Sequence, residues 1–384
     1  MSEKVVQIVL NSFVQDSRVM RVCKSLSIEG CKVTVLALHD EGLEEQEELD
    51  GYHIHRIKVV SKSLSKQPII HILKYVEFLF KAIFEINKIR PHIIHGHDPN
   101  GLFIAWLAKK LWKSRLIYDS HEYWPGAVHQ TGRYKSIFKF GVEIEKYCIK
   151  KADKVITVNT SIAELIGKIY TLEDVVVIRN IPEKATAIQI DMNNIKFPPC
   201  EFNIIYTGNV EEGRGIKHII SAMAAIRDEI GLVIVGRDSL YKKKMKSFSR
   251  SLKLQDRIYF LPAVSPNEIV SLCRVAQAGI ASIRNVCESY YLSLPNKIFE
   301  YIHAGIPVLV NNLPEMAALV KNQKIGLCFD INTVSSIVDT IHQMYEDTEH
   351  YNQFCKNAVT ASQTLNWECE QKQLLQLYKG LVSA

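Results

Sequence analysis

The segment "PNKIFEYIHAGIPVLV" spans residues 295–310. Pro295 suits the start of a helix, and Gly305 suits its end, because glycine readily adopts the left-handed conformation found there. Pro307 opens the apolar run at residues 308–310, which is typical of a buried strand. The segment therefore predicts a short helix that leads directly into a strand, as in parallel sheets covered by helices.

The rest of the chain repeats this alternation of short apolar runs and helical patterns. We predict an α/β protein with two Rossmann-like lobes, each built on a parallel sheet, and a ligand cleft between the lobes at the carboxyl ends of the strands. The strands are predicted at residues 4–10, 32–38, 53–60, 92–97, 115–121, 154–159, 175–180, 202–209, 232–236, 257–262, 278–283, 306–311 and 326–330.

The boundary between the lobes is predicted in the proline-bearing stretch at residues 181–202, which has no sustained periodicity. We assign residues 1–183 to an N-terminal Rossmann-like domain and residues 184–366 to a C-terminal one. The last helical pattern, residues 367–384, is compatible with packing on either domain, and we expect it to complete the first.

Length and composition indicate a globular protein of about two domains. The 384 residues are 47% apolar, and the net charge of +6 suits anionic ligands or acidic lipid head groups without indicating a nucleic-acid partner. None of the nine cysteines forms a C-x-x-C pair, so we expect reduced thiols in a cytoplasmic protein. No secretory signal is apparent, and Lys74, Glu77 and Lys81 interrupt the most apolar helical stretch.

Lys297 and Glu300 lie three residues apart on the predicted helix and therefore share one face. The start of this helix also presents backbone N–H groups and a positive dipole end. This combination fits a nucleoside diphosphate, with the ammonium on the phosphates and the carboxylate on the ribose hydroxyls. The alternative is an ordinary ion pair on a solvated helix face.

A second candidate site for phosphate is "IIYTGNVEEGRGIKHIISA", residues 204–222. It reads as a strand, a polar loop with glycines and a helix, which lets a phosphate approach the backbone closely. Arg214 would supply the charge. The alternative is that Arg214 is a solvent-exposed turn residue.

These segments resemble the retaining glycosyltransferases of family 4, which have the two-lobed GT-B fold. The resemblance rests on residues 295–310 and extends over nearly the whole chain, through residues 11–38, 116–124, 204–222 and 257–280. It implies transfer of a sugar, with retention, from a nucleotide-sugar donor to a glycan or lipid-linked acceptor in surface polysaccharide or glycoconjugate biosynthesis. The N-terminal domain would bind the acceptor and the C-terminal domain the donor.

The resemblance also implies roles for particular residues. Lys297 and Arg214 would hold the diphosphate, Glu300 the ribose, and His121, which follows a buried strand, would lie by the donor sugar. Further donor-binding positions are Gly208, Asn209, Gly215, Pro295 and Asn296.

Two positions depart from the family pattern. Asn209 stands where relatives often carry a second basic residue, and Leu292 stands where they often carry a first glutamate. One phosphate contact and the contacts to the donor sugar are therefore left open.

Several polar residues near strand ends are further candidates for the acceptor or the loops of the site. Asp16 and Arg18 follow the first strand and would contact the acceptor or a phosphate, although Asp16 is equally suited to capping the next helix. His97 and Asp98 follow another strand, where structural roles compete with substrate contact, and Glu122 is the neighbour of His121.

No metal or other cofactor is expected. The sequence has neither a D-x-D pair nor histidine and carboxylate residues at the spacing of metal ligands.

Residues 69–84 carry apolar side chains at helical spacing, and Lys62 and Lys66 precede them. This pattern predicts either a helix packed on its own sheet or a peripheral contact with the inner face of a membrane.

Three other functions compete with glycosyl transfer. A sugar-nucleotide epimerase and a non-catalytic nucleotide-binding protein can share the predicted architecture. A dinucleotide oxidoreductase is disfavoured, because no G-x-G-x-x-G motif occurs.

Overall fold

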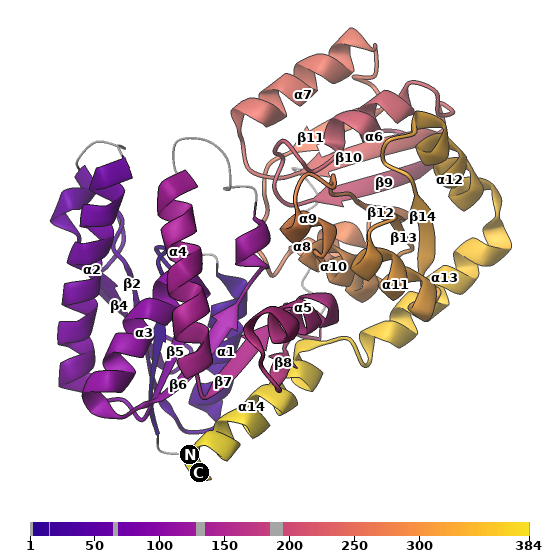
Figure 1. The fold of residues 1–384 in the computed structure, drawn as a ribbon. Coiled ribbons are helices and arrows are strands. Elements are labelled where there is room, and N and C mark those ends of the chain that lie inside the picture. Colours follow the sequence, from indigo (N-terminus) through magenta and orange to yellow (C-terminus); the bar gives the residue numbers. More distant parts are fainter. Residues whose placement is uncertain (1–2, 15, 64–67, 128–134, 185–194, 384) are drawn as a thin grey trace. The chain divides into compact units, whose positions relative to one another are not determined.

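The computed structural model describes residues 3–14, 16–63, 68–127, 135–184 and 195–383 (Figure 1). The chain forms two compact units. The N-terminal unit contains residues 1–179 and 370–384, and the C-terminal unit contains residues 180–369. The sequence analysis put the first boundary after residue 183 and a second before residue 367. The chain instead passes between the units at residues 179–180 and again within the last helix, at residues 369–370.

The described part of the N-terminal unit is built on an eight-stranded sheet in the order β3-β4-β2-β1-β5-β6-β7-β8. All neighbouring strands pair in parallel except β3, which runs antiparallel to β4 at one edge. Without β3, the first six strands have the doubly wound Rossmann order. The strands are β1 (Lys4–Ile8), β2 (Lys32–Leu38), β3 (Gln46–Leu49), β4 (Tyr52–Ile57), β5 (Ile93–His97), β6 (Arg115–Ser120), β7 (Lys154–Thr157) and β8 (Val175–Val177).

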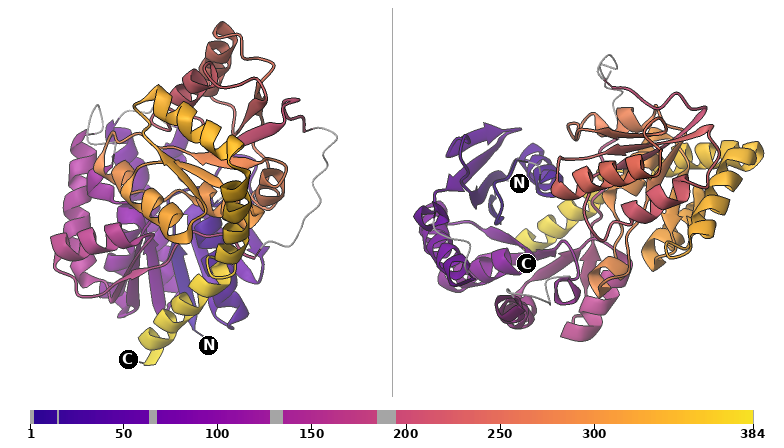
Figure 2. Two further views of the ribbon diagram at one scale, coloured as in Figure 1. Left: turned by 90° about the vertical axis from the view of Figure 1, so that its right-hand side faces the viewer. Right: turned by 90° about the horizontal axis from the view of Figure 1, so that it is seen from above.

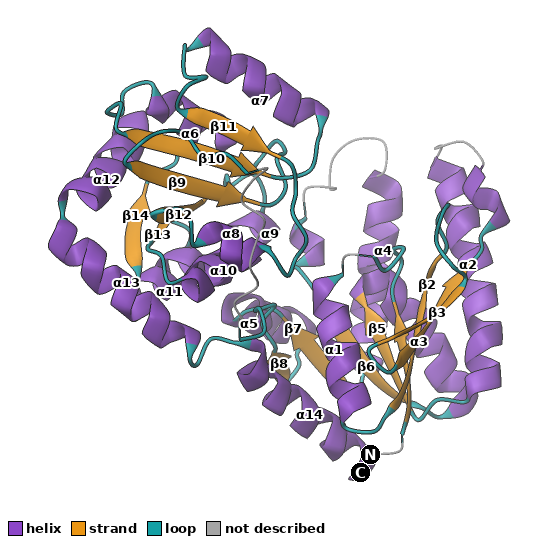
Figure 3. Cartoon of the chain, turned by 180° about the vertical axis from the view of Figure 1, so that it is seen from behind, coloured by secondary structure: helices purple, strands orange, loops and turns teal. Residues whose placement is uncertain are grey.

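Helices cover both faces of this sheet, as Figures 1 and 3 show from opposite sides. One face is covered by α2, α3 and α4, which contact one another in that order, and the other face by α1 and α14. The elements are α1 (Ser17–Ile28), η1 (Val60–Ser63), α2 (Pro68–Ile89), α3 (Asp98–Trp112), η2 (Trp124–Gly126), α4 (Lys135–Cys148), η4 (Ile149–Lys151), α5 (Thr160–Tyr170) and α14 (Trp367–Ser383).

The C-terminal helix α14 is fixed to the sheet of the N-terminal unit by buried polar contacts. The hydroxyl of Tyr378, which is fully buried, accepts a hydrogen bond from Gln7 on β1 and lies 2.8 Å from Nδ1 of His95 on β5. Lys379 forms an ion pair with Glu29 at the end of α1. Figure 2 shows this helix, in yellow, alongside the indigo segments of the unit. The last helix thus completes the N-terminal unit from Glu370 onward.

The C-terminal unit has a six-stranded parallel sheet in the order β11-β10-β9-β12-β13-β14. Counted along the chain this order is 3-2-1-4-5-6, that of a doubly wound dinucleotide-binding fold. The strands are β9 (Phe202–Thr207), β10 (Ile230–Val235), β11 (Ile258–Leu261), β12 (Ala278–Ala281), β13 (Val308–Asn311) and β14 (Gly326–Phe329). The helices are α6 (Ile216–Met223), α7 (Leu240–Ser251), α8 (Ile269–Cys273), α9 (Glu288–Tyr291), α10 (Asn296–Ala304), α11 (Pro314–Gln323), α12 (Val334–Glu346) and α13 (Thr348–Ser362).

Alternation along the strands divides the core of this unit into two layers. On β9, Ile204 and Tyr206 pack with α6, α7 and α12, whereas Ile205 packs on the opposite face with α8, α10, α11 and α13. Successive side chains of a strand point to opposite faces, so a strand covered on both sides must be apolar at nearly every position. This explains why "FNIIYT" and "IGLVIV" are almost uninterrupted apolar runs.

Each of the thirteen predicted strands is confirmed, with ends shifted by a few residues. The strand β3 was not predicted, because "QEEL" is polar and lies at a sheet edge where one partner suffices. The predicted linker lies partly outside the described residues, at 185–194. Ile181 and Phe197, on either side of that gap, both pack in the core of the C-terminal unit.

Glu145 on α4 is a buried carboxyl group whose hydrogen-bond donors, among the described residues, are two tyrosine hydroxyls. Tyr118 on β6 donates at 2.5 Å and Tyr170 at the end of α5 donates at 3.2 Å, so three elements meet at this side chain. Burial raises the pKa of Glu145 to about 7, although both tyrosine hydrogen bonds act in the opposite direction. Within the folded unit the neutral acid is therefore favoured over the carboxylate at pH values below about 7.

This raised pKa predicts that the N-terminal unit loses stability as the pH rises. Below pH 4.5, the ordinary value for the group, the carboxyl is protonated in the folded and the unfolded chain. Between that value and about 7 only the unfolded chain ionises, so folding loses up to about 3 kcal/mol, at 1.36 kcal/mol per pKa unit. Glu145→Gln keeps an acceptor for Tyr118 without the charge, and should stabilise the unit by about 1–3 kcal/mol at pH 8.5 and by much less at pH 5.

Denaturant unfolding at these two pH values tests this prediction, with Glu143→Gln as the control. Glu143 lies on the same helix but its side chain is 70% exposed. A stabilisation by Glu145→Gln that is equal at both pH values would show that ionisation of Glu145 is not its cause.

Candidate functional site

The topology places one candidate cluster in each unit, at the carboxyl ends of the strands. In a doubly wound sheet, ligands bind where the strand order reverses. In the C-terminal unit this point lies between β9 and β12, which are adjacent although β10 and β11 intervene in the sequence. In the N-terminal unit it lies between β1 and β5.

In the C-terminal unit, α10 begins and ends as the sequence predicts. Pro295 occupies the N-cap position, and Gly305 at the C-cap has the left-handed φ of 74°. Ile298, Phe299 and Ile302 are buried in the core, which anchors the helix and fixes the direction of its remaining face. The Pro295 side chain makes no capping hydrogen bond to the backbone N–H groups of the first turn.

The two charged residues of α10 turn toward the end of β9. Glu300 accepts a hydrogen bond from the hydroxyl of Thr207 at 3.0 Å. The ammonium of Lys297 lies 3.4 Å from the ring centroid of Tyr206, close enough for a strong cation–π contact. Both residues therefore flank the point where β9 ends, and both are half-buried, which disfavours the alternative of an ordinary ion pair on a solvated helix face.

The loop after β9 brings its backbone up to Lys297. Gly208 has a φ of 103°, which an L-residue rarely adopts, and a Cβ there would lie 3.7 Å from the Lys297 ammonium. Gly215, at the start of α6, has no room for a side chain, because a Cβ would come within 2.9 Å of the Ser282 hydroxyl. The side chain of Asn209 is exposed beside them.

Arg214 is held at this loop by three groups. Its Nε and one terminal nitrogen each lie 2.9 Å from the same oxygen of Glu211. Its guanidinium stacks over the ring of Tyr290 at 4.9 Å from the centroid, and its backbone carbonyl accepts from the Ser282 hydroxyl. Arg214 is therefore a positioned cation, and the alternative of an unconstrained exposed turn residue is wrong.

The electrostatics of this cluster favour an anionic ligand. Burial lowers the pKa of Lys297 well below its ordinary value, the nearby charge of Arg214 lowers it further, and Glu300 acts in the opposite direction. Two cations that repel each other beside a glycine loop gain from an anion placed between them. The residues can thus bind a phosphate group and a hydroxyl-bearing ring.

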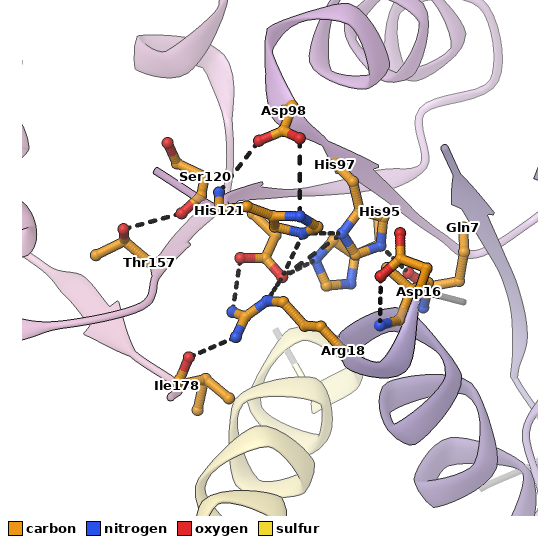
Figure 4. Close-up of polar contacts among 12 residues, drawn as sticks. Gln7, Asp16, Arg18, His95, His97, Asp98, Ser120, His121, Thr157 and Ile178 are labelled. Carbon is orange, nitrogen blue, oxygen red and sulfur yellow. Dashed lines mark hydrogen bonds and ion pairs between the residues drawn. The ribbon is translucent and has the colours of Figure 1, made fainter. Parts of the chain in front are cut away.

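In the N-terminal unit a polar cluster lies on one face of the sheet, at the ends of β1, β5 and β6 (Figure 4). The register pairs Gln7 with His95 and His97 with Asp119, so these four side chains point the same way. All four are at most 3% exposed. A fifth residue, Arg18 on α1, reaches them from the covering helix.

Arg18 and Asp119 form a bidentate ion pair, with nitrogen–oxygen distances of 2.7 and 2.8 Å. Another terminal nitrogen of Arg18 donates to the carbonyl of Ile178. Burial would raise the pKa of Asp119, but Arg18 and His121 outweigh it and hold that pKa well below its usual range. The pair is therefore ionised inside the unit and joins α1 to β6.

These contacts correct the prediction for Arg18 and support the structural alternatives that were left open for Asp16 and His97. Arg18 is 3% exposed and its guanidinium is taken up by protein groups, so it does not contact an acceptor or a phosphate. Asp16 caps α1 by accepting from the amide of Val19, and its other oxygen accepts from Asn11. His97 is buried and has protein partners on both ring nitrogens, so it has a structural role.

His121 and Asp98 remain accessible at the edge of this cluster. The side chain of His121 is 24% exposed and that of Asp98 is 36% exposed, with 3.7 Å between their nearest nitrogen and oxygen atoms. Burial lowers the pKa of His121, but the charges of Asp98 and Asp119 outweigh this and raise it to about 9. Glu122 is half-buried, and its carbonyl accepts a hydrogen bond from Ser120.

The fold creates one group of metal-ligand types that the sequence spacing did not reveal. Among the described residues, His95, His97 and Asp119 each offer an atom within 4.8 Å of the others. However, both carboxylate oxygens of Asp119 bind the Arg18 guanidinium, a fixed positive charge where a cation would have to sit. We therefore assign no metal to these residues.

The sequence analysis did not single out Tyr206, Thr207, Gln7, Asp119 or Tyr378. A signal existed for two of them: Gln7 and Asp119 are polar residues inside otherwise apolar strands, "KVVQIVL" and "RLIYDSH". A buried polar side chain needs a partner, so such positions indicate a buried network. The partner Tyr378, 371 residues from Gln7, could not be inferred from the sequence.

Comparisons with known proteins agree with this geometry. Residues 16–181 match a family model described as Glycosyltransferase Family 4, and residues 188–360 match one described as Glycosyl transferases group 1. A D-inositol 3-phosphate glycosyltransferase of Corynebacterium urealyticum is 22% identical over 317 residues, which are 75% of this chain and 71% of that protein. The match to the enzyme of the same name from Paenarthrobacter aurescens covers only 48% of this chain and 45% of that protein, at 22% identity.

Two solved structures have the same fold over nearly the full length of both chains. Sucrose-phosphate synthase from Thermosynechococcus elongatus has a TM-score of 0.82, 17% identity and coverage of 99% of each chain. Anabaena Alr3699/HepE in complex with UDP-glucose has a TM-score of 0.75 and 15% identity, and the match covers 98% of this chain and all of that one. Because the two family models together match residues 16–181 and 188–360, the chain belongs to the family-4 glycosyltransferases and has their GT-B fold.

Proposed function

We propose that this glycosyltransferase moves a sugar, with retention at the anomeric carbon, from a nucleotide-diphosphate sugar to a glycan or lipid-linked acceptor. The observation that carries the proposal is the cluster of Lys297, Arg214 and Glu300 at the switch point of the C-terminal sheet. The UDP-glucose bound to the related HepE structure supports this class of donor. We further propose a role in the synthesis of surface polysaccharides or glycoconjugates.

In this proposal, stabilisation of the negative charge on the departing diphosphate is the main electrostatic requirement of the reaction. Lys297 and Arg214 stabilise the negative charge that grows on the leaving oxygen as the glycosidic bond breaks. The backbone of Gly208, Asn209 and Gly215 approaches the phosphates without obstruction by side chains. On α10, Pro295 and Asn296 open the helix toward the same anion.

The remaining contacts concern the nucleoside and the sugar. Glu300, already held by Thr207, accepts hydrogen bonds from the ribose hydroxyls. His121 and Asp98 offer a donor and an acceptor to hydroxyl groups of the transferred sugar. Leu292 cannot make the sugar contact that a glutamate would make at that position, so the sugar is selected by other groups.

The identity of the donor is open to direct measurement. A thermal-shift screen against UDP, GDP, ADP, CMP and their sugars should give one clear stabilisation, because a ligand that binds only the folded protein raises its apparent stability. Incubation of the stabilising donor with acceptor candidates, followed by determination of the product anomer, then tests transfer and retention.

Substitution of the α10 residues should weaken nucleotide binding. Lys297→Gln and Glu300→Gln each remove one charged hydrogen-bonding group, which should cost about 1–3 kcal/mol, or roughly 5- to 150-fold in Kd. Isothermal titration with the nucleotide found in the screen measures the change. Lys321→Gln, on the exposed surface of α11, is the matched control. Folded variants with the Kd of the wild type would remove both residues from the site.

Transfer should not require a divalent metal, since Lys297, Arg214 and the start of α10 supply the positive charge. Addition of EDTA to the purified enzyme should therefore leave the transfer rate within about twofold of its original value, whereas loss of one essential charge-stabilising group typically costs about 100-fold. Loss of activity that returns when Mg²⁺ or Mn²⁺ is added would contradict this expectation.

We also propose that α2 brings the N-terminal unit to an anionic membrane. The described helices include none that is long and apolar enough to span a bilayer. The inner face of α2 packs through Phe78, Ala82 and Ile86, which are fully buried. Its outer face carries apolar side chains that are 38–67% exposed, at Ile72, Leu73, Val76, Phe80 and Phe84.

Basic side chains lie among these exposed apolar residues, as on helices that lie at a membrane surface. Lys74, Lys81 and Lys88 are on α2, and Lys88 lies over the ring of Phe84 at 4.3 Å. Of the residues considered in the sequence analysis, Lys66 and the side chains of Lys62 and Ile69 lie outside the described residues.

Flotation with vesicles that contain about 30% phosphatidylserine tests the membrane contact. The wild type should float with anionic vesicles and less with neutral ones, and the double variant Phe80→Ser/Phe84→Ser should lose most of the bound fraction, because each buried Phe contributes about 1.5–3 kcal/mol. Leu240→Ser, at an 86% exposed position of the C-terminal unit, should bind like the wild type. Absence of wild-type flotation would end this proposal.

A further inference from the structure

A chain of hydrogen bonds runs from the core of the N-terminal unit to His121. The amide nitrogen of Gln7 donates to the Tyr378 hydroxyl at 3.1 Å, and the amide oxygen of Gln7 lies 2.8 Å from Nε2 of His97. The other ring nitrogen of His97, Nδ1, lies 3.0 Å from Nε2 of His121. Gln7, His97 and Tyr378 are at most 3% exposed, so water does not compete for these bonds.

The chemistry of the partners sets the direction of this chain. An amide oxygen can only accept, so Nε2 of His97 must carry the hydrogen that it donates to Gln7. Burial lowers the pKa of His97 and so favours the neutral ring, in which Nδ1 carries a lone pair. That lone pair can only accept, and its partner at 3.0 Å, Nε2 of His121, must therefore carry a hydrogen.

This requirement also fixes which ring nitrogen of His121 lies on the accessible side of the cluster. With Nε2–H directed at His97, the other nitrogen, Nδ1, is the one that faces Asp98, at 3.7 Å. That distance is too long for a hydrogen bond. One oxygen of Asp98 accepts from the backbone amide of His121 at 3.2 Å, which leaves Nδ1 and the other carboxylate oxygen available to a ligand group between them. The 24% exposure of the His121 side chain shows that this edge is reachable.

The charges around His121 come from every element that packs against it. Among the described residues, the groups that face it are Asp98 on α3, Asp119 on β6, His95 and His97 on β5, and Arg18 on α1, while Asp16 at the start of α1 acts on His97. The two nearest carboxylates flank the ring, with Asp119 at 3.6 Å from Nε2 and Asp98 at 3.7 Å from Nδ1. They favour a second proton on the ring, consistent with its raised pKa.

We propose that Gln7 and His97, held by Tyr378, are positioning residues that keep the Nε2–H of His121 directed into the unit and leave its Nδ1–H, beside Asp98, as a cationic donor to the substrate. The fixed ring follows from these contacts together with the neutral form of His97 that burial favours, and it does not depend on the proposed function. Its importance for catalysis rests on the proposed function, in which His121 meets the transferred sugar. The chain therefore predicts that activity depends on buried residues that do not touch the substrate.

Histidine NMR tests the positioning independently of activity. Long-range ¹H–¹⁵N spectra of ¹⁵N-histidine-labelled protein give the protonation of each ring nitrogen, and the signals missing in His121→Gln identify His121. The wild type should show Nε2–H on His121 and a titration near pH 9. In His97→Leu, which has no acceptor, His121 should titrate about one pH unit lower. His97→Asn places an amide oxygen near the original Nδ1 and should restore the wild-type titration.

Two further variants keep the test decisive. Gln7→Met removes the acceptor of His97 and should also alter the His121 signals, which covers the case in which His97→Leu does not fold. Thr157→Val removes a buried hydroxyl that donates to Ser120, outside the chain, and should leave His121 unchanged. If the His121 signals of His97→Leu and Gln7→Met match those of the wild type, or if Nε2 is unprotonated in the wild type, the proposal is overturned.

Kinetics then connect the positioning to the reaction. His97→Leu should lower kcat by about tenfold or more and move the alkaline limb of the pH–rate profile to lower pH, while the Kd for the nucleotide alone, which binds the C-terminal unit, stays the same. His97→Asn should recover most of kcat. If the NMR signals shift as expected but His121→Gln keeps full activity, the positioning is supported and the assigned role of His121 in transfer is overturned.

Discussion

In both units every strand that borders the candidate cluster runs in the same direction, and this constraint determines where chemistry can occur. Parallel strands end together at one edge, and their helices cover both faces, so that the strand ends are the places where polar groups can gather. In the C-terminal unit, β9 ends at Thr207 and Gly208, next to α10 with Lys297 and Glu300. In the N-terminal unit, β5 and β6 end at His97 and Ser120.

Because of the same constraint, burial of the N-terminal polar cluster costs free energy unless each polar group has a particular partner. Gln7, His95, His97 and Asp119 lie on a sheet face that α1 and α14 cover, so each must find its partner inside the protein. The ion pair of Arg18 and Asp119 carries the largest desolvation cost, and its stabilisation depends on a bidentate geometry. Removal of either partner would leave the other as an unpaired buried charge. The ion pair therefore fixes α1 and β6 relative to each other.

Much of the fold could be predicted from the sequence because local patterns determine it. Apolar runs located thirteen strands, and Pro295 with Gly305 bounded α10 correctly. Lys297 and Glu300 were predicted together because three residues along a helix is a fixed geometry. The strand β3 escaped detection because its acidic residues match no apolar pattern, and its pairing depends on the neighbour β4.

The N-terminal cluster could not be predicted in the same way, because its partners are brought together only by the fold. Arg18 follows the first strand and therefore resembled a ligand-binding residue, but Asp119, 101 residues away, takes up its charge. The sequence allowed Asp16 to be either a ligand contact or a helix cap. The hydrogen bond from the amide of Val19 to its carboxylate shows that it caps α1. For His97, position after a strand indicated a site, whereas its burial and its contacts with Gln7 and His121 give it a structural role.

On the proposed function, the C-terminal cluster is prepared for an anion before the anion binds. Burial desolvates Lys297, and its ammonium lies over the ring of Tyr206. Arg214 is neutralised by Glu211, whose side chain is 45% exposed and can turn to solvent at little cost. A diphosphate would therefore replace a partly exposed carboxylate at Arg214 and offset the desolvation of the Lys297 ammonium. On the proposed function, this exchange makes donor binding favourable without a metal ion, because both cations are already in place and need no reorganisation when the leaving group gains its charge.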